Sequence, residues 1–381
     1  MKNLLEHAYQ IAGCYFDENF VKVIHPLDKG NINNTFIVYV KDGISTQKYI
    51  LQNINQNIFH KPEDLMNNLD HVLTHIHNKL IKYRKTNKDR YWNFPRLKKN
   101  NIDNSILTKR NHLYWRVITY IENSLSLTNL ENDHDGFELG YALSTFHSLM
   151  SDFQPSLLKT IIPDLFTTEN YLIRLSDLLF SLPKEFSAHH PEFNQITELG
   201  EFFLSRKHII LNFNAISFSL NLTRNLIHSD PKISNILLDK ATRKAISVID
   251  LDTVCMGYLV FDIADCLRSI CNRHGEDNTD ISLVEFNLVV FKSMLMGYKS
   301  VRSTNLLSIY DCNYLVESIK LITLQLGIRF FSDYLDGNIY FSVNRPNQNL
   351  ERAKVQFRLV ESIENQSEAL NEIIYEIFNE S

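Results

Sequence analysis

The sequence contains no long apolar run. No window approaches the roughly 18 consecutive apolar residues that a membrane-spanning helix needs. Residues 1–20 carry Glu6, Asp17 and Glu18 and lack an unbroken apolar stretch, so we expect neither a signal peptide nor a membrane anchor there. No internal repeat, low-complexity tract or long linker is visible. The chain is therefore expected to be a globular protein that has no membrane partner.

Cysteine pairs and metal-binding histidine patterns are also missing. The five cysteines form no CxxC pair, and such an odd, scattered set is typical of buried thiols in a reducing compartment; they are Cys14, Cys255, Cys266, Cys271 and Cys312. No HExxH motif occurs, and no carboxylate or cysteine stands at metal-ligand spacing from His75, His77, His189 or His190. We expect a cytoplasmic protein whose histidines lie at the surface or are satisfied by hydrogen bonds.

Charge of one sign is nowhere concentrated. The net charge is -5, and acidic and basic residues are interspersed along the chain. The absence of a basic block argues against a nucleic-acid partner and against a polybasic membrane footprint. With 381 residues, 44% hydrophobic and 22% charged, the composition is that of an ordinary globular protein large enough for two domains.

The pattern of elements changes near residue 121. Before it, strand-like segments surround one long helix that begins after Pro62; the strands are expected at 20–25, 35–40, 47–52, 105–108 and 113–121. After it, helical periodicity dominates at 136–151, 168–181, 192–204, 283–298, 314–335 and 350–378, with a β-like island at 226–252. This outline predicts an α+β, two-lobed protein-kinase-like fold. A small β-rich N-lobe (1–121) would bind nucleotide, and a mostly helical C-lobe (122–381) would carry the catalytic loop and the acceptor pocket.

Residues 228–235, His-Ser-Asp-Pro-Lys-Ile-Ser-Asn, form the pattern H-x-D-x-K-x-x-N. Phosphoryl transfer needs an aligned hydroxyl, a group that accepts its proton, and cations that neutralise the phosphates. Asp230 is suited to orient the hydroxyl and take its proton, and Lys232 to place an ammonium against the γ-phosphate. Asn235 offers a hard oxygen ligand for magnesium. His228 is expected to brace the loop by hydrogen bonds, although a catalytic role is the alternative.

A second carboxylate follows the next strand. Residues 245–249 are expected to form a strand that delivers Asp250 at its carboxyl end, where the second magnesium contact is needed. Taken singly, Asp230 and Asp250 are equally well explained as a turn residue and a strand terminator. Turn chemistry does not require His, Lys and Asn at these offsets, so the ordered set favours a phosphotransfer site.

Two further segments stand where a nucleotide would bind. Residues 30–36, Gly-Asn-Ile-Asn-Asn-Thr-Phe, lie between two expected strands, as a phosphate-covering loop does, although an ordinary turn explains them too. Residues 116–121 fall at the lobe boundary, where adenine would lie against the backbone; the alternative is an edge strand. The predicted cofactor-binding residues are Gly30, Asn31, Asn33, Thr35, Gln52, Ile118 and Tyr120.

The set HSDPKISN, VIDLDTV, Gly257 and residues 261–269 (FDIADCLRS) resembles the aminoglycoside phosphotransferase and choline kinase superfamily. Within it, the greatest similarity is to bacterial N-acetylhexosamine 1-kinases, in segments 30–36, 49–55, 57–59, 62–66, 326–335, 338–341 and 349–353. The resemblance implies ATP and Mg²⁺ as cofactors, Asp230 as catalytic base, and Asn235 with Asp250 on the metal. It also implies that Asn34, Asp252, Arg329 and Tyr340 contact the sugar; alternatively, Arg329 is a helix-surface charge and Tyr340 a core aromatic residue.

The sequence departs from this family at several positions. Gln52 occupies the place of the usual phosphate-binding strand lysine, and Lys48 lies earlier on the same face of that strand. The inserted helix has no mid-helix acidic residue to pair with a lysine. Asn31 and Asn34 stand where the group often has His and Asp, and Leu165-Phe166 replaces a familiar Phe-His pair.

Three functional hypotheses remain open at this point. The first is a sugar 1-kinase that phosphorylates the anomeric hydroxyl of an N-acetylhexosamine or related sugar. The second is a kinase for an amino alcohol, a homoserine-like metabolite or an aminoglycoside, although Arg268 and Arg329 do not suit a polycation. The third, prompted by the missing lysine, is a non-catalytic nucleotide- or sugar-binding regulator. In each case we expect a monomer or weak homodimer.

Overall fold

The computed structural model describes residues 2–17, 21–27, 32–43, 45–86, 90–163, 167–182, 192–216, 221–301 and 306–379. The chain forms two compact units. Unit 1 comprises Met1–Leu125, Asp152–Ile162 and Leu238–Thr253, and unit 2 comprises Ser126–Ser151, Pro163–Leu237 and Val254–Ser381. The division therefore differs from a single cut after residue 121, because the chain returns twice to unit 1. The Asn68 side chain bonds the backbone of Lys159, and Asn93 N donates to Ile246 O, which ties both returning segments to unit 1.

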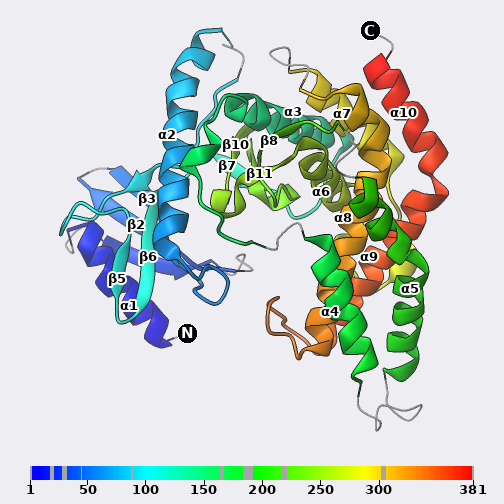
Figure 1. The fold of residues 1–381 in the computed structure, drawn as a ribbon. Helices are drawn as coiled ribbons and strands as arrows, with labels where there is room; N and C mark the ends of the chain where they lie inside the picture. The colour runs from blue at the N-terminus through cyan, green and yellow to red at the C-terminus, as the bar shows by residue number, and fades with distance from the viewer. Residues whose placement is uncertain are drawn as a thin grey trace. The chain divides into compact units, whose positions relative to one another are not determined.

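Unit 1 is built on an antiparallel sheet in the strand order β1-β2-β3-β6-β4, with β5 also paired to β6 (Figure 1). The strands are β1 (Val21–Pro26), β2 (Asn34–Asp42), β3 (Ser45–Asn53), β4 (Leu97–Lys98), β5 (Thr108–Arg110) and β6 (Leu113–Thr119). The β2–β3 hairpin pairs Asp42 with Ser45 at its turn, where Gly43 has φ +60°. Glycine adopts this left-handed conformation without a Cβ clash. The strands expected at 35–40 and 47–52 are confirmed and pair as this hairpin.

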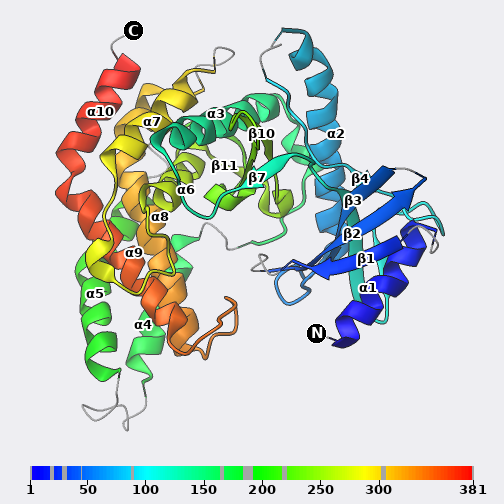
Figure 2. The ribbon, with the colours of Figure 1, turned by 180° about the vertical axis from the view of Figure 1, so that it is seen from behind.

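Two helices belong to the same unit: α1 (Lys2–Tyr15) and α2 (Pro62–Thr86). Figure 2 shows α1 lying against the sheet, and Ile11 and Ala12 of this helix are fully buried with Val38, Leu51 and Trp115. The period-two alternation of β2 therefore places its apolar residues under α1. The long helix α2 begins at Pro62 as predicted, because proline fits the first helical turn, where its missing N–H is not needed.

The segment that carries the predicted site contains short elements: β7 (Ser124–Ser126), β8 (Arg224–Ile227), β9 (Ile236–Asp239), β10 (Ala245–Val248) and β11 (Cys255–Tyr258). In unit 2, β8 and β11 pair in antiparallel fashion, from Arg224 opposite Tyr258 to Ile227 opposite Cys255. Short 3-10 helices follow at Ile233–Asn235 and Leu251–Thr253. The β-like island at 226–252 is thus confirmed.

Unit 2 is otherwise helical. Its helices are α3 (Asp133–Met150), α4 (Thr168–Phe180), α5 (Phe193–Ile216), α6 (Leu259–Cys271), α7 (Leu288–Lys299), α8 (Ile309–Leu335), α9 (Gln348–Asn365) and α10 (Ser367–Asn379). The single helix expected at 350–378 is wrong: α9 and α10 are separate. The Gln366 side chain between them donates to the backbone of Phe286 and Ser362, which fixes the break. No described helix is both long and apolar enough to cross a bilayer.

Helices α3 and α7 pack backbone against backbone. A Cβ added to Gly297 would lie 2.0 Å from Phe137 O, and one added to Gly140 would lie 2.0 Å from Met294 O. Because these neighbours are main-chain atoms, the clash is relieved only by separating the helices. We expect Gly297→Ala to destabilise the protein by about 3 kcal/mol, measured by chemical denaturation.

Gly200→Ala is the matched control for Gly297→Ala. This glycine lies inside α5, and its added Cβ would meet only the Leu179 side chain at 3.6 Å. The same substitution is expected to stabilise the protein by about 0.8–1 kcal/mol, because alanine has the higher helix propensity. Equal effects of the two substitutions would contradict close packing of α3 on α7.

Candidate active site

Strand β8 leads directly into the predicted catalytic loop of unit 2. Lys232 Nζ lies 2.7 Å from Asp230 Oδ2. Asn235 Nδ2 donates to Asp230 O at 2.9 Å and to Asp230 Oδ2 at 3.3 Å. The side chains of Asp230 and Lys232 are 32% and 28% exposed, so they remain accessible to a ligand. The structure therefore brings Asp230, Lys232 and Asn235 together.

The orientation of the Asn235 amide matters for metal binding. Since its nitrogen is held by two acceptors on Asp230, the amide oxygen is the free atom, and no described residue donates to it. An amide oxygen is a ligand that suits Mg²⁺, as is the carboxylate of Asp250. No group of three or more His, Cys, Asp or Glu side chains in the described part of the chain could hold a metal alone.

The buried carboxylate of Asp262, on α6, anchors the catalytic loop. Its oxygens accept the backbone N–H groups of His228 at 2.6 Å and Ser229 at 2.7 Å. Ser229 has φ +69°, a conformation that a non-glycine residue keeps only where its surroundings hold it. His228 is fully buried, and its Nδ1 accepts from Asp230 N at 3.3 Å. The bracing role predicted for His228 is confirmed.

His147 of α3 extends this anchor. Its Nε2 lies 2.9 Å from Asp262 Oδ2 and its Nδ1 lies 2.8 Å from Tyr298 Oη. Burial raises the pKa of Tyr298 well above its ordinary value, so the phenol stays protonated and can donate a hydrogen bond to Nδ1. His147 Nε2 then donates to the carboxylate, which only accepts. The network fixes one tautomer of His147 and holds Asp262 rigidly.

The next turn of α6 carries a second acid beside Asp230. Burial raises the pKa of Asp265, against the opposing effect of Arg268, whose Nε donates to Asp265 Oδ1 at 2.8 Å. Arg268 also lies 3.7 Å from Glu276 and is 6% exposed. Arg268 is thus engaged with two carboxylates and is not an open cation for an acceptor.

Unit 1 holds the remaining predicted groups around Asp252, which is 5% exposed. Arg116 on β6 donates to Asp252 Oδ1 at 2.6 Å and to Oδ2 at 2.8 Å, and Asn33 Nδ2 donates to Oδ2 at 3.0 Å. Gln52 accepts from Arg116 Nε at 2.9 Å and donates to Thr35 Oγ1 at 3.2 Å. Protein donors therefore occupy both oxygens of Asp252, which was predicted to contact substrate.

Burial alone would lower the pKa of Arg116, but the carboxylates of Asp252 and Asp250 outweigh burial and raise it. Arg116 therefore stays charged inside unit 1. Asp250 follows β10 with φ +64°. From sequence, Arg116 was placed only in the segment 116–121, which was expected to lie against adenine or to form an edge strand. Its contacts with Gln52 and Asp252 come from the tertiary structure.

The other described residues that were considered for nucleotide or substrate binding in unit 1 lie on or next to the strands of its sheet. Ile118 lies in β6 opposite Ile50, and Tyr120 follows that strand. Asn34 Nδ2 lies 3.4 Å from Asn53 Oδ1. Lys48 pairs with Glu122 at 2.9 Å, so a carboxylate already engages its ammonium. Gly30 and Asn31, like Leu165-Phe166, lie outside the described residues.

Arg329, on α8, stands among aromatic rings. Its guanidinium lies 5.5 Å from the Tyr171 ring and 5.4 Å from both Tyr340 and Phe341, and no described carboxylate pairs with it. Asp333 accepts the backbone N–H groups of residues 339, 340 and 341 at 2.7–2.9 Å and fixes this segment. The structure brings Arg329 and Tyr340 together, and neither Asp333 nor Tyr171 was assigned a role from sequence.

The family model described as "Phosphotransferase enzyme family" matches residues 23–281. The chain belongs to this phosphotransferase family. That segment includes the catalytic loop, Asp250 and Asp252, so the predicted phosphotransferase class is confirmed.

Individual relatives of this phosphotransferase are distant. A homoserine kinase of Hyphomonas neptunium is 37% identical over 89 residues, which is 23% of this chain and only about a quarter (26%) of that protein. A microcompartment-associated aminopropanol kinase matches with TM-score 0.55 and 17% identity over 96% of this chain and 98% of its own. Plasmodium vivax ethanolamine kinase matches with TM-score 0.57 and 15% identity over 90% and 84%. These structural matches establish the kinase-like fold predicted from sequence.

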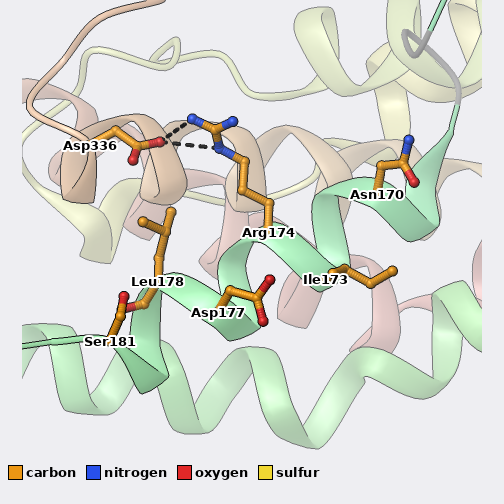
Figure 3. A pocket seen from close by; sticks show the side chains of 7 residues that line it. All are labelled: Asn170, Ile173, Arg174, Asp177, Leu178, Ser181 and Asp336. Carbon is orange, nitrogen blue, oxygen red and sulfur yellow. Dashed lines mark hydrogen bonds and ion pairs between the residues drawn. The ribbon is translucent and has the colours of Figure 1, made fainter.

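A separate pocket of about 480 Å³ lies beside α4 of the phosphotransferase. Figure 3 shows Arg174 extending from α4 to Asp336, with which it forms an ion pair. None of the predicted site residues lines this pocket. Arg174 and Asp336 neutralise each other, and the remaining polar side chains of the lining are Asn170, Asp177 and Ser181.

Proposed function

We propose that this phosphotransferase transfers the γ-phosphate of ATP, with Mg²⁺, to a hydroxyl group of a small molecule. The arrangement of Asp230, Lys232 and Asn235 carries the proposal. Asp230 orients the acceptor hydroxyl and takes its proton, and the ammonium of Lys232, now paired with Asp230, neutralises charge on the phosphate. When bound, Mg²⁺ neutralises the phosphate oxygens; Asn235 and Asp250 would hold it.

The proposed nucleotide contacts are Gly30, Asn31, Asn33, Thr35, Gln52, Ile118 and Tyr120. Within this set, Gln52, Thr35 and Asn33 belong to the hydrogen-bond network around Asp252. Because that network occupies both Asp252 oxygens, we assign Asp252 to positioning instead of to direct substrate contact. The unpaired cysteines support a cytoplasmic location, where ATP is available.

For the acceptor, we propose an N-acetylhexosamine or a related sugar phosphorylated at its anomeric hydroxyl. The Arg329 guanidinium, which no described carboxylate pairs with, lies beside Tyr340 and suits a ligand that offers a carbonyl oxygen and an apolar ring face. The N-acetyl group supplies the first and the pyranose C–H face the second. A polycationic aminoglycoside is disfavoured because Arg329 would repel it.

A homoserine-like acceptor is the second candidate. The 37% identity to a homoserine kinase over 89 residues favours it. The carboxylate of such an amino acid would pair with Arg329, whereas ethanolamine or aminopropanol would bring only an ammonium to the same cation.

ATP consumption across N-acetylhexosamines, other hexoses, homoserine, ethanolamine and aminopropanol tests these proposals. Turnover with an N-acetylhexosamine and none with the amino alcohols supports the sugar proposal. Turnover with homoserine alone replaces it by the second candidate. If no acceptor is phosphorylated although ADP binds, the chain is a nucleotide-binding regulator.

Arg329→Met is expected to raise KM for the acceptor about 10- to 100-fold, with a smaller change in kcat, because a charge-assisted hydrogen bond to the acceptor is lost. Steady-state kinetics with varied acceptor measure this effect. Arg358→Met removes an exposed guanidinium that pairs with Glu361 on α9, and it serves as the control, with KM near that of the wild type. An unchanged KM in Arg329→Met would remove this residue from the acceptor site.

A further inference from the structure

A buried cation lies on the strand next to Gln52. The resemblance places a phosphate-binding lysine at position 52, and this chain has glutamine there. In the antiparallel ladder Gln52 on β3 stands opposite Arg116 on β6, and Arg116 Nε donates to the Gln52 side chain at 2.9 Å. Arg116 is 2% exposed. Arg116 is therefore a buried cation on the strand that pairs with β3 at position 52.

The Arg116 guanidinium points toward Asp252 and is shielded from solvent. Its two terminal nitrogens donate to the two oxygens of Asp252 at 2.6 and 2.8 Å, and Asn33 donates to one of these oxygens at 3.0 Å. A fully buried ion pair contributes little net stability compared with apolar residues of the same size. The Arg116–Asp252 pair is better explained by the geometry that it imposes. Its two parallel hydrogen bonds fix both the distance and the plane of the carboxylate.

Asp252 lies in the 3-10 helix Leu251–Thr253, which follows Asp250 directly. Asp250 has φ +64°, so its backbone depends on neighbours that hold it. Asn33, which directly precedes β2, links the same carboxylate to the residues after β3, because its Oδ1 also accepts from Asn55 N at 3.0 Å. One carboxylate thus connects the proposed metal ligand to the segment that precedes β2.

We propose that Arg116 is a positioning residue for the metal: through its bidentate contact with Asp252 it fixes the carboxylate of Asp250 for Mg²⁺ bound with nucleotide. This inference rests on the proposed nucleotide and metal site, not on the identity of the acceptor. Gln52, Asp252 and Met66 accept four of the five N–H groups of the buried Arg116, so we assign it no direct contact with phosphate.

Arg116→Lys tests the proposal in the full-length protein. Lysine keeps the charge but cannot make two parallel hydrogen bonds to Asp252 and a third to Gln52. We expect Mn²⁺ binding in the presence of saturating ADP, followed by electron paramagnetic resonance, to weaken about 10- to 100-fold, as is typical when an outer-shell partner of a metal ligand is lost. ADP binding without metal, measured in EDTA by calorimetry, is expected to stay at the wild-type level.

Arg206→Lys is the matched control. Arg206 also makes a bidentate contact, with Glu364, between α5 and α9 of unit 2. The same substitution there is expected to leave Mn²⁺ binding unchanged. If Arg116→Lys fails to fold, Asp252→Asn supplies the test, since it keeps the shape and removes the charge; it is expected to weaken Mn²⁺ binding similarly.

Wild-type Mn²⁺ affinity in the folded variants would overturn the proposal. An equal loss of metal-free ADP binding would also overturn it, because the defect would then lie in the whole nucleotide site. Neither readout requires turnover. Failure of ADP or Mn²⁺ binding in the wild-type protein would instead refute the proposed kinase function.

Discussion

Asp230→Asn is expected to lower kcat by about 10²- to 10⁴-fold, the range contributed by a general base. Asparagine has nearly the same shape and can keep a hydrogen bond to Asn235, but it does not accept the hydroxyl proton. The reduction should appear in kcat with little change in KM for ATP, since no phosphate contact is removed. The measurement is steady-state ATP consumption with the best acceptor of the panel.

Asp133→Asn provides the control for this experiment. Asp133 is 51% exposed at the start of α3, where it pairs with Arg273. Its substitution is expected to leave kcat unchanged. If Asp230→Asn retains the wild-type kcat, Asp230 is not the base, and a different residue has to be sought for proton transfer.

Asp262→Ala is expected to reduce the free energy of unfolding by about 3–5 kcal/mol. The backbone N–H groups of His228 and Ser229 and the Nε2–H of His147 would lose their acceptor inside unit 2. Each buried donor left unsatisfied costs about 1–3 kcal/mol. Urea denaturation followed by fluorescence and circular dichroism measures the loss.

Two variants calibrate this result. Asp262→Asn should destabilise less, because its carbonyl oxygen still accepts from part of the donor set. Asp336→Ala removes a partly exposed ion pair with Arg174 and should cost about 1 kcal/mol or less. If Asp262→Ala and Asp336→Ala were equally stable, the catalytic loop would not depend on the α6 carboxylate.

The catalytic loop illustrates what local sequence can predict. Asp230, Lys232 and Asn235 lie within six residues of one another, so short-range hydrogen bonds set their geometry, and the motif predicted both their grouping and the bracing role of His228. The strands expected at 20–25, 35–40, 47–52 and 113–121 were also predictable, because period-two burial follows from backbone geometry alone. The strand expected at 105–108 is wrong in its bounds, since β5 is Thr108–Arg110, and β4 was not expected.

Contacts between residues far apart in the chain could not be predicted from local sequence. His147 meets Asp262 across 115 positions, and Arg116 meets Asp252 across 136. No periodicity or motif links residues so far apart. The break between α9 and α10 depends on contacts of Gln366 with Phe286, a residue 80 positions away, so helical periodicity alone predicted one helix.

The sequence by itself determined the phosphotransferase class, the change from a β-rich part to a helical part, and the identity of the loop residues, because each is encoded by neighbours in the chain. Only the tertiary structure decided how the functional residues are held. Asp262 accepts the backbone N–H of Ser229 in the loop, Asp333 accepts the backbone N–H of Tyr340, and Arg116 lies opposite Gln52. Such contacts depend on which distant side chains share a buried space. The energy of a buried polar group is set by that space and not by its neighbours in sequence.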